Sequence, residues 1–234
     1  MGCIQMKILA IGAHPDDIEI FMFGFLSCCK EMGYKISAIV ATDGSLGGRN
    51  DDNKLVKSRK KETQNGLNKL AIPLFLNLPD GNLGNENIHT NIVKNSIQKI
   101  SPDLIVTHYY KDYHSDHINL SKIVKTVAGH YTPILYCDTM MGINFLPNYY
   151  VDVTQFMNDK INAISCHKTQ KPERFINLAK LMNTYRSAQC NAPEGKYAEA
   201  YIFEPSFPFT DIRKLLPDSP KILPFHIENI NGFL

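Results

Sequence analysis

The sequence predicts an α/β protein in which a mostly parallel sheet lies between two layers of helices. Two observations predict this fold class. Short apolar segments alternate along the chain with longer segments of helical periodicity, which is typical of strands joined by helical crossovers. The apolar segments are also nearly continuous instead of alternating with polar residues, as expected of strands that are buried on both faces.

Each expected strand is a short segment rich in apolar residues. The first, MKILAIGA, is followed within two residues by a proline, and the second, KISAIVAT, runs into a loop with three glycines. The expected strands are residues 6–13, 35–42, 73–78, 103–108, 133–140, 149–153 and 196–203.

The segments between these strands have the apolar spacing of helices that pack on a sheet. Gly33 suits the end of the first helix, and Ser101-Pro102 ends the third. The expected helices are residues 17–32, 54–70, 87–100, 115–129, 154–167 and 172–189. With right-handed crossovers, this succession gives a Rossmann-like three-layer sandwich with helices on both faces. No repeat or low-complexity linker divides the chain, so we expect a single domain over residues 1–234.

Composition excludes several classes of partner. A chain of 234 residues with 44% hydrophobic residues can form one substantial core. Lysine and arginine number 25 against 23 aspartates and glutamates, so the net charge of +2 gives no electrostatic reason to expect a nucleic acid partner. No stretch reaches the ~20 apolar residues of a membrane helix, so we expect no membrane insertion.

Cysteine usage and the N-terminus favour the cytoplasm. The six cysteines show no CxxC spacing, and we expect free thiols in a reducing compartment. The N-terminus lacks the basic segment, apolar run and small-residue cleavage site of a secretory signal. The sequence therefore predicts a cytoplasmic protein, and it leaves the oligomeric state open, a homo-oligomer included.

A first polar motif, A-H-P-D-D-I-E, follows the first expected strand. His14 leaves the sheet where open α/β folds bind ligands. Pro15 cannot continue the ladder of hydrogen bonds, and Asp16 and Asp17 suit the positive end of the following helix. An imidazole and two carboxylates therefore lie within four residues of one another. Alone, they would also fit an ordinary acidic first turn with a capping histidine.

A second polar motif, H-S-D-H, follows the fourth expected strand. His114 and His117 lie three residues apart, which places both imidazoles on one side of a helical first turn. The two strands that carry the motifs are expected to flank the point where the strand order reverses, so the motifs can meet across about a hundred residues of chain. Two histidines and one aspartate leave a coordination position for water, as in catalytic zinc sites.

The two motifs, A-H-P-D-D-x-E and H-x-D-H, resemble those of the PIG-L/LmbE-like family of zinc-dependent N-acetylglucosaminyl N-deacetylases. Other segments that resemble this family follow in order along the chain: the Thr42-x-Gly44 loop, Arg59-x-x-Glu62, Leu78-Pro79-Asp80-Gly81 and His167-Lys168-Thr169-Gln170. The resemblance implies a metal-dependent hydrolase that removes the N-acetyl group of an N-acetylaminosugar and releases acetate and a free amine.

The same resemblance implies a role for each residue of the two motifs. His14, Asp17 and His117 are expected to hold Zn²⁺, or another divalent ion such as Fe²⁺, and Asp16 to act as the general base on its water. His114 is expected to stabilise the oxyanion or to protonate the leaving amine. Asp116 is expected to orient His114, which can then stay protonated.

The family resemblance also implies a small-molecule partner, an N-acetylated sugar conjugate of the N-acetylglucosamine type. Arg59 and Asp80 match positions that contact the sugar or its substituent, and Arg59 suits an anionic aglycone. Each has a simpler interpretation, because Arg59 fits an exposed position on a basic helix and Asp80 before Gly81 fits a turn. His167 and Lys168 fit a helix C-terminus better than catalysis.

Two other functions are compatible with the sequence. The same water-activating residues would serve a deacylase of another small amide metabolite. The glycine-rich loop at residues 44–48 would also fit a metal-free α/β module that binds a nucleotide or sugar, although it lacks the G-x-G-x-x-G pattern and follows the second strand.

Overall fold

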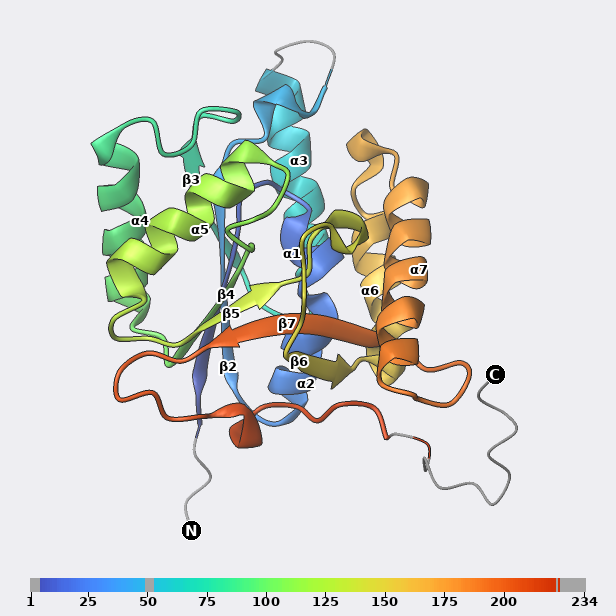
Figure 1. Ribbon diagram of the computed structural model, residues 1–234. Helices are drawn as coiled ribbons and strands as arrows, with labels where there is room; N and C mark the ends of the chain where they lie inside the picture. The colour runs from blue at the N-terminus through green and yellow to red at the C-terminus, as the bar shows by residue number, and fades with distance from the viewer. Residues whose placement is uncertain (1–4, 49–52, 222, 224–234) are drawn as a thin grey trace.

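The computed structural model describes residues 5–48, 53–221 and 223. Within these residues one seven-stranded sheet has the strand order β3-β2-β1-β4-β5-β7-β6 (Figure 1). The strands are β1 (Lys7–Gly12), β2 (Lys35–Thr42), β3 (Pro73–Leu78), β4 (Leu104–Thr107), β5 (Ile134–Cys137), β6 (Tyr149–Asp152) and β7 (Ala198–Glu204). Each lies within a few residues of an expected strand.

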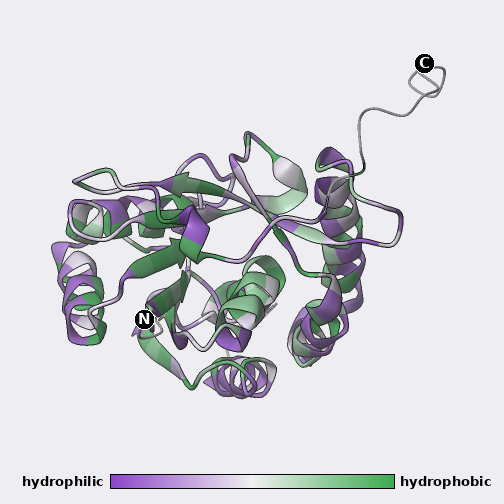
Figure 2. Ribbon diagram, turned by 90° about the horizontal axis from the view of Figure 1, so that it is seen from below, coloured by the Kyte–Doolittle hydropathy of each residue, from purple (hydrophilic) through white to green (hydrophobic). Residues whose placement is uncertain are grey.

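Helices cover both faces of the sheet (Figures 1 and 2). The helices are α1 (Asp17–Phe21), α2 (Phe23–Glu31), α3 (Asn53–Gly66), α4 (Asn87–Ile100), α5 (Ser115–Ala128), α6 (Met157–Ser165) and α7 (Glu173–Gln189). The apolar cluster on one face includes residues of α4 and α5, and the clusters on the other include residues of α1, α2, α6 and α7. The predicted three-layer α/β architecture is confirmed.

Strand β1 is the third strand of the sheet and lies beside the central strand, β4. It pairs in parallel with β2 on one side and with β4 on the other, so the strand order reverses at β1 and β4 as predicted. Ile8 and Ala10 point into the cluster under α1 and α2, whereas Leu9 and Ile11 point into the cluster under α4 and α5. All four are fully buried, which explains the continuous apolar pattern of this segment.

The far side of the sheet is antiparallel. Strand β7 inserts between β5 and β6 and runs antiparallel to both. The other five strands, in the spatial order β3-β2-β1-β4-β5, are parallel. The sheet is therefore mostly parallel, as expected, although periodicity alone did not indicate where β7 would insert.

The first helix differs from the prediction of one helix over residues 17–32. The backbone leaves helical geometry at Met22, with φ −131° and ψ −9°, and α2 begins afresh at the next residue. The Glu199 carboxylate of β7 accepts hydrogen bonds from the backbone N–H groups of Gly24, at 2.9 Å, and Phe25, at 2.8 Å. A side chain at residue 24 would place its Cβ 2.5 Å from Val153, so glycine permits this close approach.

A buried polar network holds this break in place. The Lys160 ammonium of α6 lies 2.7 Å from Glu199 Oε1 and 3.0 Å from Asn183 Oδ1, and the Tyr201 hydroxyl donates to Glu199 Oε2 at 2.6 Å. Lys160 and Glu199 are 1% and 2% exposed. Because a buried carboxylate is costly without such partners, the network fixes α2, α6 and α7 against β7.

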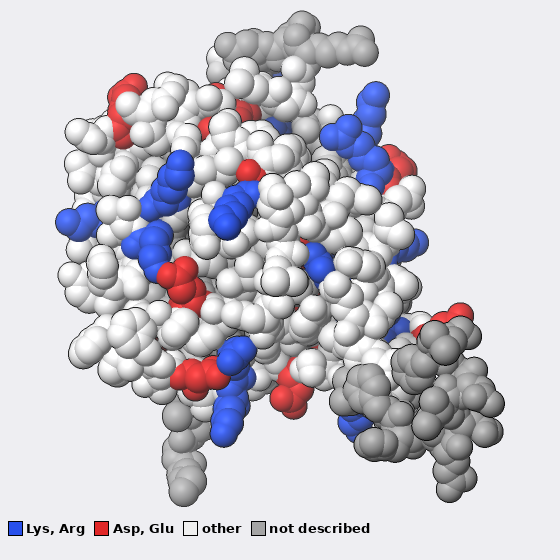
Figure 3. All heavy atoms as spheres, in the orientation of Figure 1, with Lys and Arg blue, Asp and Glu red and all other residues white. Residues whose placement is uncertain are grey.

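The surface shows no extended patch of one charge on the face drawn in Figure 3, where basic and acidic side chains are interspersed. No helix in the described part of the chain is long and apolar enough to span a bilayer. The five described cysteines are free thiols, as predicted, and Cys3 lies outside the described residues.

We expect Lys160→Met to lower the free energy of unfolding by about 3–5 kcal/mol, because it leaves the Glu199 carboxylate buried without its cation. Urea denaturation followed by circular dichroism measures the change. Lys180→Met, at an exposed position of α7, is the matched control and should shift stability by less than about 0.5 kcal/mol. Equal stability of the two variants would contradict a structural role for the ion pair.

Candidate active site

A cleft of about 270 Å³ opens at the carboxyl ends of the central strands. Seven of the eight residues that the sequence singled out line it, from four segments of the chain: His14, Asp16, Asp17, Arg59, Asp80, His114 and His117. The eighth, Asp116, contacts His14. The two motifs therefore meet at the reversal point between β1 and β4, as their positions after these strands predicted.

The Asp17 carboxylate lies between the two histidines that were expected to share a metal with it. Its Oδ2 accepts the backbone N–H of His14 at 2.7 Å and lies 3.4 Å from His14 Nδ1. Its Oδ1 lies 3.3 Å from His117 Nε2. Burial alone would raise the pKa of Asp17, but the neighbouring imidazoles of His117 and His108 hold it well below its usual range.

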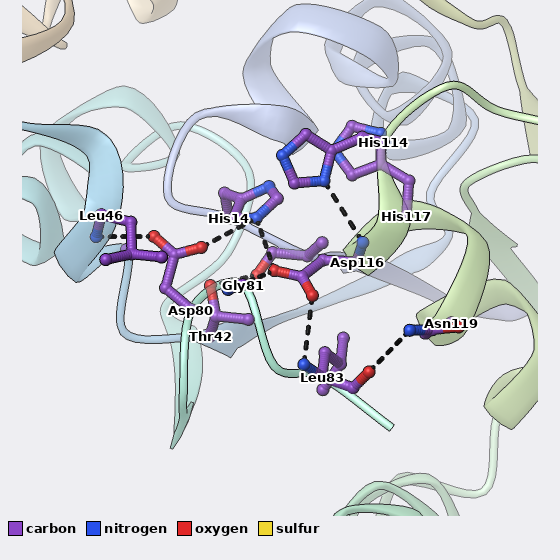
Figure 4. A network of polar contacts seen from close by, with 12 residues as sticks. His14, Thr42, Leu46, Asp80, Gly81, Leu83, His114, Asp116, His117 and Asn119 are labelled. Atoms are coloured by element: carbon purple, nitrogen blue, oxygen red, sulfur yellow. Dashed lines mark hydrogen bonds and ion pairs between the residues drawn. The ribbon is translucent and has the colours of Figure 1, made fainter. Parts of the chain in front are cut away.

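Carboxylates hold the outer nitrogen of each of these two histidines. His14 Nε2 lies 3.2 Å from both Asp80 Oδ1 and Asp116 Oδ2 (Figure 4). His117 Nδ1 lies 3.1 Å from Asp112 Oδ2. In each ring one nitrogen therefore faces Asp17, Nδ1 in His14 and Nε2 in His117, and the other nitrogen contacts a second carboxylate. Such contacts orient histidine ligands around metal ions.

The donor set fits a divalent cation. Ligand atoms of His14, His114 and His117 lie within 4.8 Å of one another, and so do those of Asp17, His108 and His117. Burial lowers the pKa of His117, but the Asp17 and Asp112 carboxylates outweigh it and raise that pKa to about 9. The cluster thus attracts positive charge at the point where the imidazoles and Asp17 converge.

His108 is a site residue that the sequence reasoning missed. It is fully buried, its Nε2 lies 3.0 Å from Asp17 Oδ2, and its ring stacks on that of His117 at 3.7 Å between centroids. Burial and the His117 charge lower its pKa to about 4. The sequence feature that could have identified His108 is its position at the end of the expected strand 103–108, which was expected to lie beside the strand that precedes His14. Asp112 was missed too, since it belongs to neither motif.

The structure corrects the role expected of the Asp116 carboxylate. Its oxygens accept the backbone N–H groups of Gly81 at 2.7 Å and Leu83 at 3.1 Å, and it contacts His14 instead of His114 (Figure 4). His114 is oriented by the backbone N–H of Asp116, which donates to its Nδ1 at 3.2 Å. The reason is local, because His114 is the N-cap residue of α5 and accepts one of the first helical N–H groups.

The structure also favours a neutral His114 over the protonated ring that was expected. Burial and the charges of His14 and His117 lower the pKa of His114. Since Nδ1 accepts a hydrogen bond, the neutral ring carries its proton on Nε2. His114 can therefore donate a hydrogen bond without being charged.

Arg59 is neither exposed nor a free receptor for an anion. It is 3% exposed, and its guanidinium donates to the carbonyl oxygens of Gly44 and Pro15, each at 2.8 Å, and to Asp16 Oδ2 at 3.2 Å. Asp80 is also engaged, because its second oxygen accepts the backbone N–H of Leu46 at 3.0 Å. In this structure both residues hold other parts of the site.

Asp16 has a strained backbone and a shifted pKa. Its φ of 131° lies in the region that favours glycine. Burial raises the pKa of its carboxyl to about 6, against the opposing charge of Arg59. Arg59 thus fixes a carboxylate that lines the cleft beside the candidate metal ligands.

A model of the family described as PIG-L, GlcNAc-PI de-N-acetylase, matches residues 9–128, which contain both motifs. The chain belongs to the PIG-L family. This PIG-L protein is 28% identical over 178 residues to an uncharacterised deacetylase, YaiS, of Escherichia coli K12, covering 69% of this chain and 90% of that one.

Two solved structures share the fold of this PIG-L protein. N,N′-diacetylchitobiose deacetylase from Pyrococcus horikoshii has 21% sequence identity and a TM-score of 0.76, with 91% of this chain and 90% of that chain covered. The 4-carboxy-2-hydroxymuconate hydratase of Pseudomonas putida KT2440 has 17% identity and a TM-score of 0.75, with 94% and 100% covered. The fold is thus shared by a deacetylase and a hydratase.

We expect Asp112→Ala to weaken zinc binding by about 10–100-fold, because His117 loses the carboxylate that orients it. Titration against a chromophoric chelator measures the affinity. Asp159→Ala removes a half-buried carboxylate on α6, which pairs with Lys69 outside the cleft, and should leave the zinc affinity unchanged. Unaltered zinc affinity in Asp112→Ala would show that His117 needs no support from Asp112.

Proposed function

We propose that this protein is a metal-dependent N-deacetylase that hydrolyses the acetamide of an N-acetylaminosugar conjugate of the N-acetylglucosamine type. The observation that carries the proposal is the contact of the Asp17 carboxylate with both His14 and His117, in a cleft that Asp16 also lines. Membership of the PIG-L family and the deacetylase names of two similar proteins support it.

His14, Asp17 and His117 are the proposed ligands of Zn²⁺. A divalent ion bound there supplies a Lewis acid and lowers the pKa of its water toward ~7. Fe²⁺ suits the same imidazole and carboxylate donors, so the donor set is compatible with either ion.

Asp16 and His114 are the proposed catalytic residues. Asp16 takes a proton from the attacking water as the oxygen bonds to the acetamide carbon, and it returns that proton to the amine nitrogen as the C–N bond breaks. Acetate and a free amine are released. His114 Nε2–H donates to the carbonyl oxygen as negative charge develops on it, and a neutral imidazole is sufficient for this.

Arg59, Asp80 and Asp116 act as positioning residues in this proposal. Arg59 holds the Asp16 carboxylate, and the other two hold His14. We also propose that residues 1–234 form one deacetylase domain. Two elements beyond the matched residues 9–128 support this. Residues of α7 line the cleft, and β7 is part of the sheet.

A metal-free nucleotide-binding module has less support. Its sequence evidence was the glycine-rich loop, but this loop wraps around Arg59 instead of presenting an open backbone. The Gly44 carbonyl accepts from Arg59, and a Cβ at residue 44 would lie 2.9 Å from the guanidinium. Close packing on Arg59 thus explains Gly44 and Gly47 without a bound phosphate.

The two adjacent aspartates give the sharpest mutational prediction. We expect Asp17→Ala to lose metal affinity, whereas Asp16→Asn should keep the metal and lose about 10²–10⁴ in rate, because a general base contributes to turnover more than to binding. Metal content after dialysis and the deacetylation rate at saturating zinc measure the two effects. An empty site in Asp16→Asn with a filled one in Asp17→Ala would reverse the assignment.

Chelation tests the function directly. Wild-type protein should release primary amine from N-acetylglucosamine derivatives, lose this activity after treatment with a chelator, and regain it with added zinc or iron. Fluorescamine detection of the amine follows the reaction, with simple acetamides as the comparison substrates. Absence of bound metal together with absence of amine release after metal addition would refute the proposal.

A further inference from the structure

Arg174 is a cation in the cleft that the proposed reaction does not use. It is the second residue of α7 (Glu173–Gln189), and it is exposed and lines the cleft. Within the described residues its guanidinium has no hydrogen bond or ion pair. The guanidinium lies over the ring of Phe175, whose centroid is 4.6 Å from Arg174 Cζ.

The charges around the cleft make Arg174 distinct. The other arginine that lines it, Arg59, is buried against Asp16. Asp17 and Asp80 face the histidines that are proposed to surround the metal. Two arginines and no lysine are found among the described residues that line the cleft. Of these two, Arg174 forms no ion pair with a protein carboxylate in the described part of the chain.

Tyr113 lines the same cleft as Arg174. Burial and the Asp112 and Asp17 carboxylates raise the pKa of Tyr113, whereas the charges of His14 and Arg174 oppose this rise. The Tyr113 side chain is 54% exposed and also lines the cleft. A guanidinium and a phenol hydroxyl thus border the same cleft, and both can donate hydrogen bonds to a bound molecule.

Phe175 adds to this geometry. A ring against the guanidinium gives it a cation–π partner, while the N–H groups at the guanidinium edge stay available. The planar fork of N–H groups matches the two oxygens of a carboxylate or phosphoryl group. A group so placed recognises an anion more readily than a neutral hydroxyl.

We propose that Arg174 binds an anionic group, carboxylate or phosphoryl, that the N-acetylated substrate carries apart from its acetamide. The proposal rests on the proposed deacetylase function and deepens it, because it makes the substrate an acidic conjugate. Deacetylation then converts an anion into a zwitterion, since the released amine is protonated at neutral pH. Arg174 lies beyond the matched residues 9–128, so this is a property of the C-terminal part of the chain.

Three substrates with the same acetamide test the proposal: methyl N-acetyl-β-glucosaminide, which is neutral, N-acetylglucosamine 1-phosphate and N-acetylmuramic acid. We expect the wild type to prefer one or both anionic substrates. Arg174→Met should lower kcat/KM for the preferred anion about 10–100-fold more than for the neutral glycoside, mainly through KM, because one charged contact is lost. The preferred anion tells phosphoryl from carboxylate recognition.

Two further variants sharpen this test. Arg174→Lys keeps the charge and should retain part of the preference, whereas Lys180→Met, which removes an exposed cation of the same helix, should keep all of it. Raising the salt concentration should weaken the preference in the wild type and have no such effect in Arg174→Met. Equal losses for neutral and anionic substrates in Arg174→Met, or an intact preference, would overturn the proposal.

Direct binding separates this proposal from the deacetylase function. If the wild type hydrolyses none of the three compounds, the proposed function fails. Calorimetric titration of the zinc-loaded protein with the same compounds then tests Arg174 by itself. Anion binding that Arg174→Met removes supports the proposal, and an anion affinity that is undetectable, or equal in the two proteins, overturns it.

Discussion

The burial of carboxylates at the reversal point of the sheet is the constraint on which the rest of the site depends. Four aspartates of the site are buried: Asp16, Asp17, Asp112 and Asp116. An isolated buried carboxylate costs several kcal/mol, so each requires a cation or several donors nearby. Arg59 serves Asp16, the backbone N–H groups of the loop after β3 serve Asp116, and imidazoles surround Asp17.

The sheet supplies the rigidity that these pairings need. Thr42 ends β2 and its hydroxyl donates to the Ala13 carbonyl at 2.8 Å, while the Thr107 hydroxyl, at the end of β4, donates to the Ile11 carbonyl at 3.0 Å. Both neighbours of β1 therefore hold the backbone just before His14. Ligands that leave such a fixed strand end keep their mutual geometry better than ligands on a free loop.

The parts of the structure that follow from local pattern could be predicted from the sequence. Strand positions, the reversal point and the meeting of His14 with His117 depend on apolar runs and on right-handed crossovers. The break at Met22 could not be predicted, because Glu199, which caps the new helix, lies far along the chain. The burial of Arg59 could not be predicted for the same reason, since its hydrogen-bond partners come from two other loops. Residue type and spacing identify candidates, whereas long-range packing decides what each one contacts.

The two arginines of the cleft illustrate this difference. Arg59 holds the Pro15 carbonyl and the carboxylate of Asp16, and the Asp16 φ of 131° costs roughly 1–3 kcal/mol in a non-glycine residue. Such a conformation persists only where surrounding contacts determine it, and the guanidinium provides two of them. Because Arg59 is 3% exposed and its guanidinium already holds the Asp16 carboxylate, it is poorly placed to bind a substrate anion as well. A cation outside this network, such as Arg174, is better placed to recognise charge on the substrate.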